Sequence, residues 1–169
     1  MKRSLIAICS CVSCTTVPFK DPSNFHLVEP GLYRSGRPEI GVIKYLHDTY
    51  NIKTIISLET YAAGEDYKAK EVQAALANGI AFINLSMNSS GDLDKEKVLL
   101  GVRTIQSVAR PILVHCYRGA ERTGVVIGAY RIMINKWTYA SAVTEMDSFG
   151  FSPLYKSWKK TLKEIEAGQ

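Results

Sequence analysis

The segment of residues 115–124 holds residue types that could together carry out a chemical reaction. It contains a cysteine, Cys116, and six positions later an arginine, Arg122. Five intervening residues let the chain curl so that both side chains face a single phosphate group. A thiolate could then attack phosphorus and form a phosphocysteine, while a guanidinium clamps two phosphate oxygens through parallel hydrogen bonds. The spacing therefore predicts Cys116 as the nucleophile and Arg122 as the phosphate clamp.

The surrounding residues complete a loop that is suited to binding an anion. A loop between a buried strand and a helix presents successive backbone N–H groups inward, and the helix dipole adds positive potential. Gly119 permits a close backbone approach. We expect Thr123 to donate a hydrogen bond to the sulfur and ease its departure, and His115 to orient the loop through hydrogen bonds to the backbone. The predicted phosphate-binding residues are Tyr117, Arg118, Gly119, Ala120, Glu121 and Arg122.

A general acid must protonate the departing oxygen, and the sequence offers several carboxyl groups for this role. We expect Asp92, in a polar loop between a strand and a helix, to be the general acid. Glu121 is the alternative, because a carboxyl beside a bound dianion tends to hold its proton. Asp92 and its neighbour Asp94 could instead cap the following helix. Glu121 could instead form a salt bridge with one of three arginines, Arg34, Arg37 or Arg118.

Alternating strand and helix patterns must position this loop. Strands are expected at residues 25–28, 32–35, 53–58, 80–85 and 112–114. Helices are expected at residues 38–50, 65–78, 94–109, 125–135, 138–149 and 153–166. This alternation predicts an α/β fold with a mainly parallel central sheet of about four to five strands, flanked by helices. Tyr33 and Arg34 should support the loop from beneath or line its pocket, although packing alone would explain Tyr33. The residues Tyr61, Glu65 and Tyr67 form either the rim of the pocket or a solvent-exposed turn.

Residues 115–124 resemble the signature of the protein tyrosine and dual-specificity phosphatase superfamily, which reads His-Cys, five residues, Arg, and then Ser or Thr. Residues 31–38, GLYRSGRP, are similar to the N-terminal part of atypical dual-specificity phosphatases first recognised in plants and fungi and also found in bacteria. The resemblance covers nearly all of residues 24–150. It implies a protein tyrosine phosphatase-like fold and hydrolysis of phosphate monoesters without metal or cofactor. Such relatives act on phosphotyrosine, phosphoserine or phosphothreonine, phosphoinositides or inositol pyrophosphates.

The loop departs from the plant and fungal pattern at two positions. Those proteins end the loop Gly-Lys-His-Arg-Thr-Gly, whereas this sequence has Ala120 and Glu121 in place of the Lys and the His. The missing cations weaken the prediction of an inositol pyrophosphate substrate, although Arg118 partly compensates. Two other functions stay open. One is a rhodanese-like sulfurtransferase, whose loop usually lacks the Arg-Thr-Gly ending, and the other is a catalytically weak, phosphate-binding pseudophosphatase.

The first residues predict a lipoprotein-type signal segment. Residues 1–14 begin with a basic Met-Lys-Arg stretch and continue with a short apolar run and small residues. We expect export and attachment to a bacterial membrane through lipidated Cys11 or Cys14, and the alternative is a cytoplasmic protein. Residues 15–24 contain two prolines and predict a tether to a phosphatase domain at residues 25–169.

The composition supports one folded domain and limits its partners. The 169 residues are 46% hydrophobic and 22% charged, as expected for a single well-filled core. The net charge of +5 would fall by two without Lys2 and Arg3, which is too little to predict binding to nucleic acid. Cys116 is the single cysteine after residue 14, so no disulfide or cysteine-built zinc site is expected in the domain. We expect a monomer whose partner is its phosphorylated substrate, a protein or an inositol phosphate or phosphoinositide.

Overall fold

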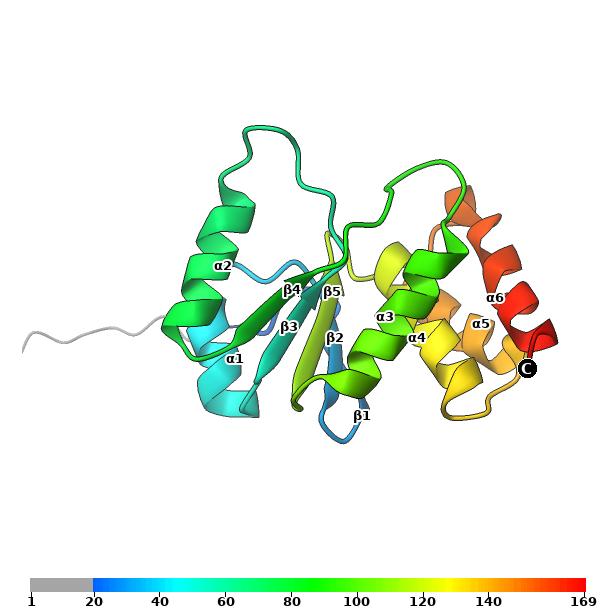
Figure 1. The fold of residues 1–169 in the computed structure, drawn as a ribbon, viewed down its shortest axis with the longest axis horizontal. Coiled ribbons are helices and arrows are strands. Elements are labelled where there is room, and N and C mark those ends of the chain that lie inside the picture. Colours follow the sequence, from blue (N-terminus) through cyan, green and yellow to red (C-terminus); the bar gives the residue numbers. More distant parts are fainter. Residues whose placement is uncertain (1–19) are drawn as a thin grey trace, which may run out of the picture.

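A five-stranded sheet forms the centre of the molecule (Figure 1). The structure, a computed structural model, describes residues 20–169, so Cys11, Cys14 and the first half of the predicted tether, residues 15–19, lie outside the described residues. The strands are β1 His26–Glu29, β2 Leu32–Gly36, β3 Thr54–Ser57, β4 Ala81–Asn84 and β5 Ile112–Cys116. They lie in the order β1-β2-β5-β3-β4, with β1 antiparallel to β2 and every other neighbouring pair parallel. The predicted mainly parallel α/β sheet is confirmed.

Helices cover both faces of the sheet (Figure 1). One face carries α1 (Val42–Tyr50) and α2 (Tyr67–Ala77). The other carries α3 (Lys95–Ser107), α4 (Glu121–Met133), α5 (Tyr139–Ser148) and α6 (Trp158–Ala167), with a short 3-10 turn η1 (Pro153–Tyr155) before α6. Each face has its own hydrophobic core, because successive strand residues point to opposite sides: Leu113 packs toward α1 and α2, and Val114 toward α4. Within residues 20–169, no helix combines the length and apolarity needed to cross a bilayer.

Three predicted helix boundaries are wrong, each for a local reason. α4 begins at Glu121 rather than at Val125, because its first turn contains the polar end of the predicted loop and so lacks an apolar pattern. α1 begins at Val42, four residues after Pro38, with Gly41 at its N-cap. The helix predicted at residues 153–166 is divided into η1 and α6, and Trp158 at the start of α6 is 2% exposed.

Candidate active site

The predicted loop, residues 115–124 and hereafter the catalytic loop, lies at the carboxyl end of the central strand. β5 ends at Cys116 and α4 begins at Glu121, so the loop joins the strand to a buried helix. Parallel β2 and β3 flank β5, and ligands of α/β proteins commonly bind at this end of such strands. Cys116 is 1% exposed. The dipole of the 13-residue α4 favours negative charge at this position.

Gly119 is required by its own conformation and by its neighbours. Its φ of +73° lies in the left-handed region, which glycine adopts most readily. A Cβ at this position would lie 2.4 Å from the backbone nitrogen of Gly36 and 2.5 Å from the carbonyl carbon of Ser35. The loop therefore approaches the end of β2 very closely. Across the same junction, the N–H of Arg37 donates to the carbonyl oxygen of Tyr117 at 3.1 Å.

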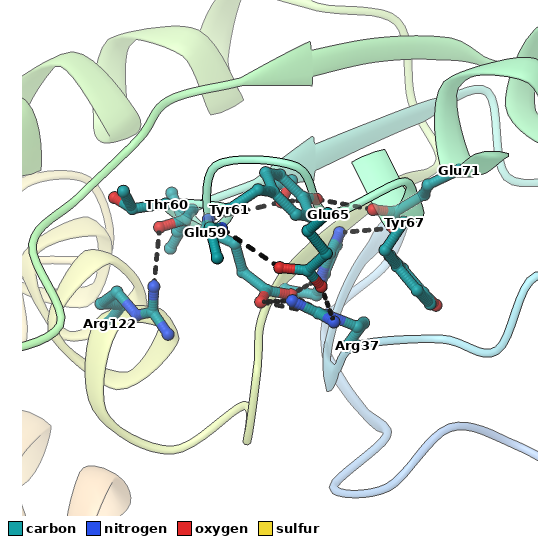
Figure 2. A network of polar contacts seen from close by, with 12 residues as sticks. Arg37, Glu59, Thr60, Tyr61, Glu65, Tyr67, Glu71 and Arg122 are labelled. Carbon is teal, nitrogen blue, oxygen red and sulfur yellow. Dashed lines mark hydrogen bonds and ion pairs between the residues drawn. The ribbon is translucent and has the colours of Figure 1, made fainter. Parts of the chain in front are cut away.

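A pocket of about 290 Å³ adjoins the catalytic loop, close to the lower limit of ~300 Å³ for small-molecule sites. Arg122 lines this pocket, and its Nη1 donates a long hydrogen bond of 3.5 Å to the carbonyl oxygen of Leu58 (Figure 2). Three aromatic side chains also line it, namely Tyr117, Tyr155 and Trp158. The lining of the pocket thus includes both the Arg122 guanidinium and aromatic side chains.

Glu121 forms an ion pair within the catalytic loop. Its Oε1 accepts a hydrogen bond of 2.8 Å from Arg118 Nη1, so Arg118 is its partner among the three arginines considered from the sequence. Both residues line the pocket, which places Glu121 where a leaving group could reach it. To act as the proton donor, Glu121 would have to give up this ion pair with Arg118.

The segment of residues 86–94, hereafter the acid segment, is mostly exposed. Asp94 caps α3, because its Oδ1 accepts a hydrogen bond of 3.0 Å from the backbone N–H of Glu96. Asp92 is exposed and is not among the residues that line the pocket, whereas Ser89 of the same segment is. Asp92 would therefore have to move toward the pocket to act as the general acid, and this role stays a prediction.

A network of charged groups beside the catalytic loop was not predicted (Figure 2). Arg37 donates to both carboxylate oxygens of Glu59, from Nε at 2.9 Å and from Nη2 at 2.6 Å. Arg37 Nη1 also donates to Glu65 at 2.8 Å. The hydrogen bond to Glu59 is the largest cause that raises the pKa of Arg37. Two of the predicted rim residues, Tyr61 and Tyr67, stack beneath this guanidinium, and the rim residue Glu65 pairs with it, so these three residues brace Arg37.

His115 lies between two buried carboxylates rather than against the backbone groups that we expected it to contact. Its Nε2 is 3.0 Å from Glu71 Oε1, and its Nδ1 is 3.6 Å from Glu59 Oε1. Neither ring nitrogen has a hydrogen-bond partner among residues 20–169, so the expected bonds from the ring to the backbone are not seen in that part of the chain. Glu71 reaches His115 from α2, where it shares a buried face with Ala75. That helical spacing is the sequence signal that could have identified it.

Two further residues, Arg34 and Thr123, were expected to act on the catalytic loop, and they differ in whether their side chains are hydrogen-bonded. Arg34 supports the catalytic loop from beneath, as predicted, because its Nη2 donates to the carbonyl oxygen of Gly119 at 2.7 Å. Thr123 is fully buried, and its hydroxyl has no hydrogen-bond partner among the described residues. The bond from Thr123 to the sulfur of Cys116 is thus not formed here.

Within residues 20–169, no group of three or more His, Cys, Asp or Glu side chains is arranged to hold a metal ion.

Comparison with known proteins identifies the family. The model of the tyrosine phosphatase family matches residues 20–165, which is most of the chain. This chain belongs to the tyrosine phosphatase family. Its relatives include the inositol diphosphatase DSP5 of Arabidopsis thaliana, 33% identical over 129 residues that cover 73% of this chain and 60% of the relative. The dual specificity protein phosphatase TpbA of Pseudomonas aeruginosa is 33% identical over 135 residues, which cover 78% of this chain and 57% of TpbA.

Solved structures of tyrosine phosphatase relatives share the fold. The core catalytic domain of the phosphatase SIW14 from S. cerevisiae has a TM-score of 0.74 and 26% identity, and the match covers 88% of this chain and 87% of that domain. The crystal structure of P. aeruginosa TpbA has a TM-score of 0.69. These matches confirm the predicted phosphatase-like fold and the resemblance to atypical dual-specificity phosphatases. This tyrosine phosphatase family member spans about three fifths of the length of the curated relatives.

Family membership also bears on the alternatives left open by the sequence. The matching family model is that of a phosphatase, which favours phosphatase chemistry over sulfur transfer. Relatives with both inositol diphosphatase and dual specificity phosphatase names match at similar identity. The comparison therefore leaves the choice between these substrates to the geometry of the pocket.

Proposed function

We propose that this chain hydrolyses phosphate monoesters through a phosphocysteine intermediate on Cys116. One observation carries the proposal: Cys116 ends the central strand, and Arg122, six residues later, lines the adjoining pocket. Backbone N–H groups of the catalytic loop and the N-terminal end of α4 would hold the phosphate oxygens. Nucleophile, anion cradle and clamp are then all parts of one short segment.

The reaction would proceed in two displacements at phosphorus. The Cys116 thiolate attacks, the S–P bond forms, and the P–O bond to the leaving group breaks. The departing oxygen takes the electron pair of that bond and a proton from the general acid or from water. Water then attacks phosphorus, and the S–P bond breaks to release inorganic phosphate and the thiolate. Arg122 would stabilise both transition states by donating two hydrogen bonds to the equatorial oxygens.

The charge balance of the pocket favours an aryl phosphate such as phosphotyrosine. Arg37 is paired with Glu59 and Glu65, and Arg118 is paired with Glu121. These ion pairs leave few free cations for a substrate with several phosphate groups. The aromatic walls suit an aromatic leaving group, because ring pairs add favourable contacts beyond their buried area.

An inositol diphosphate is the second candidate, and the names of the plant and yeast relatives motivate it. Two observations favour it in the structure: Arg118 is largely exposed, and both Arg118 and Arg37 also line a neighbouring hollow that could take a second phosphate group. Such a substrate would compete with Glu121 and Glu59 for these guanidinium groups.

A substrate panel tests both candidates. The full chain is assayed in EDTA against a phosphotyrosine peptide, a phosphoinositide and an inositol diphosphate, with Cys116→Ser as the blank. We expect kcat/KM to be highest for the phosphotyrosine peptide. A higher value for the inositol diphosphate would support the second candidate. Binding without turnover of any substrate would identify a pseudophosphatase, and transfer of sulfur from thiosulfate to cyanide would identify a sulfurtransferase.

We also propose that the chain is exported in a bacterium and attached to a membrane through a lipid on Cys11 or Cys14. The basic start, the apolar run and the cysteines of residues 1–14 support this. The test is fractionation of bacteria that express the full chain, compared with a variant in which both cysteines are changed to Ser. We expect the unmodified chain in the membrane fraction and the variant in the soluble fraction. Recovery of the unmodified chain in the cytoplasm would contradict this proposal.

A further inference from the structure

Arg34 is a buried cation directly behind the catalytic loop. It lies on β2 with 1% of its surface exposed, and its register partner on β5 is Val114. Gly36 pairs with Cys116 two positions further along the same strands. Because side chains two positions apart share a face, Arg34 and Cys116 project from the same side of the sheet. The Arg34 guanidinium is thus placed beneath the loop that holds the nucleophile.

A second buried arginine shows how such a charge is usually stabilised. Arg131 on α4 is 8% exposed and binds both carboxylate oxygens of Glu145, with Nη2–Oε1 at 2.7 Å and Nε–Oε2 at 3.1 Å. Within residues 20–169, Arg34 has no carboxylate at ion-pairing distance, and its Nε and Nη1 have no hydrogen-bond partner. Its guanidinium instead lies 4.1 Å from the centre of the Phe149 ring. A buried charge without a counter-charge is costly, so its presence here points to a role in function.

Within residues 20–169, the side chain of Arg34 makes one hydrogen bond, and this bond fixes a peptide group of the catalytic loop. Arg34 Nη2 donates to the carbonyl oxygen of Gly119 at 2.7 Å, on the buried side of the loop. In a planar trans peptide the C=O and the next N–H point in opposite directions. The N–H of Ala120 therefore points away from Arg34. Without Arg34 this peptide could rotate and turn a carbonyl oxygen, rather than an N–H, toward a bound anion.

The charged groups near Arg34 are Cys116 of the catalytic loop, Arg131 of α4 and Glu145 of α5. Burial lowers the pKa of Arg34 to about 10, and the negative charges of Glu145 and Cys116 oppose this effect. The guanidinium thus stays charged at neutral pH. Burial and, to a smaller extent, the charge of Arg34 lower the pKa of His26 on the neighbouring strand β1. Arg131 on α4 is the other cation in range, and its own carboxylate partner balances it.

We propose that Arg34 is a positioning residue whose unpaired, buried guanidinium is the counter-charge for the anions of the catalytic loop, the Cys116 thiolate and the bound phosphate. It also locks the Gly119–Ala120 peptide with its N–H toward the phosphate. This inference rests on the proposed phosphatase function, since that function places an anion in the loop. The negative charge that balances Arg34 comes first from the Cys116 thiolate and then from the bound phosphate.

The test compares Arg34→Met with Arg131→Met as the matched control. Two measurements that need no turnover are made on the full chain. The first is the rate of alkylation of Cys116 by iodoacetamide as a function of pH, followed by mass spectrometry of the peptide that contains Cys116. The second is the affinity for tungstate, an oxyanion that mimics phosphate. The melting temperature of each variant is also recorded. The other titratable groups around the thiol are the same in all variants: Arg37, Glu59, His115, Arg118, Glu121 and Arg122.

For Arg34→Met we expect the alkylation midpoint to rise by at least about one pH unit, since loss of an opposite charge disfavours the thiolate. Tungstate binding should weaken about tenfold, which corresponds to ~1.4 kcal/mol. The melting temperature should stay or rise, because an apolar side chain replaces a buried charge that has no partner. Arg131→Met should instead lower the melting temperature, since Glu145 loses its partner, and should leave both anion measurements unchanged. Arg34→Lys, which keeps the charge, should restore most of the alkylation midpoint.

The proposal is overturned if Arg34→Met shifts neither anion measurement, or if Arg131→Met shifts both by as much. A fall in melting temperature alone would show a merely structural role and also overturn it. Should Arg34→Met not fold, Arg34→Gln, which keeps a donor for Gly119 but no charge, is measured in the same way. An inactive wild-type chain would contradict the proposed function without changing the outcome of these measurements.

Discussion

The catalytic loop and the acid segment reach the same pocket but are supported very differently. The catalytic loop is buried except at Tyr117 and Arg118, and Arg34 donates to the Gly119 carbonyl and Asn24 to the carbonyl of Arg118. The acid segment leaves the sheet after β4 and arches beyond the start of α3 on the side of α6 (Figure 1), and residues 88–92 are exposed. At its centre, a Cβ added to Gly91 would meet nothing within 4 Å. The nucleophile and the phosphate clamp are therefore held in place before a substrate binds, whereas the proposed proton donor lies on a segment with few contacts.

The largest effect should come from the best-supported residue, Cys116. Cys116→Ser should abolish turnover, because a serine hydroxyl is far from ionised at neutral pH. Tungstate affinity should stay similar to that of the wild type, because the backbone cradle is unchanged. Steady-state assays and isothermal titration calorimetry measure the two effects. Appreciable hydrolysis by pure Cys116→Ser would contradict the role of the catalytic loop as the source of the nucleophile.

The acid segment is tested by Asp92→Asn with an alkyl phosphate, whose leaving group needs a proton. We expect the rate to fall by roughly 10² to 10⁴ and the basic limb of the pH–rate profile to flatten. An aryl phosphate should be affected much less. Asp94→Asn is the matched control, because asparagine caps a helix as well as aspartate does and the charge change is the same.

A different outcome would relocate the general acid. If Asp92→Asn is nearly silent on alkyl phosphates while Glu121→Gln is severe, the proton comes from the catalytic loop, and the division between the two regions is wrong. If both variants are silent, water protonates the leaving group.

Arg122→Lys should lower kcat by roughly 10² to 10³, as expected when a transition-state donor is lost. An ammonium group keeps the charge but cannot make two parallel hydrogen bonds. Arg118→Lys is the control, because the Arg118 side chain is 58% exposed and its pair with Glu121 needs only one contact. Equal losses in the two variants would show that the pocket requires positive charge and not the geometry of a clamp.

The smallest effect on rate should come from Glu71→Gln, because Glu71 only supports the catalytic loop. The main effect of this substitution should be on stability. Glu71 is fully buried, 3.0 Å from His115, and accepts a hydrogen bond of 2.6 Å from Tyr61. Removing this buried charge should lower the free energy of unfolding by about 1–3 kcal/mol. Glu65→Gln, in a partly exposed pair with Arg37, should cost less than about 1 kcal/mol. Chemical denaturation measures both, and equal values would show that the buried cluster adds no rigidity.

The parts of the site that are continuous in sequence could be predicted, and the parts that depend on packing could not. Cys116, Arg122 and the need for Gly119 follow from the spacing within one loop. The helical spacing of Glu71 and Ala75 could have marked Glu71 as buried, but the meeting of Glu59 and Glu71 at His115 depends on how β3 and α2 pack against β5.

The fold was predicted on the same basis. Short strand-like runs between helical patterns identified all five strands, while the start of α4 was missed because the first turn of this helix is also the end of the catalytic loop. The acid segment has no periodicity at all. Its tip is held by the hydrogen bond from Trp158 Nε1 to the carbonyl oxygen of Gly91 at 2.8 Å, and its end by the Asp94 cap. Both contacts depend on tertiary packing or on an exact helix start, so the sequence could name candidates there but could not place them.

The most direct test of the account is to trap the covalent intermediate on Cys116. The full chain is mixed with excess aryl phosphate, quenched in acid within one turnover, digested, and analysed by mass spectrometry. We predict one phosphoryl group on the peptide that contains Cys116, formed no more slowly than the aryl alcohol is released and absent from Cys116→Ser. Release of the alcohol with phosphate on another residue, or an oxygen-18 label showing direct attack of water on the substrate without a covalent species, would contradict the account.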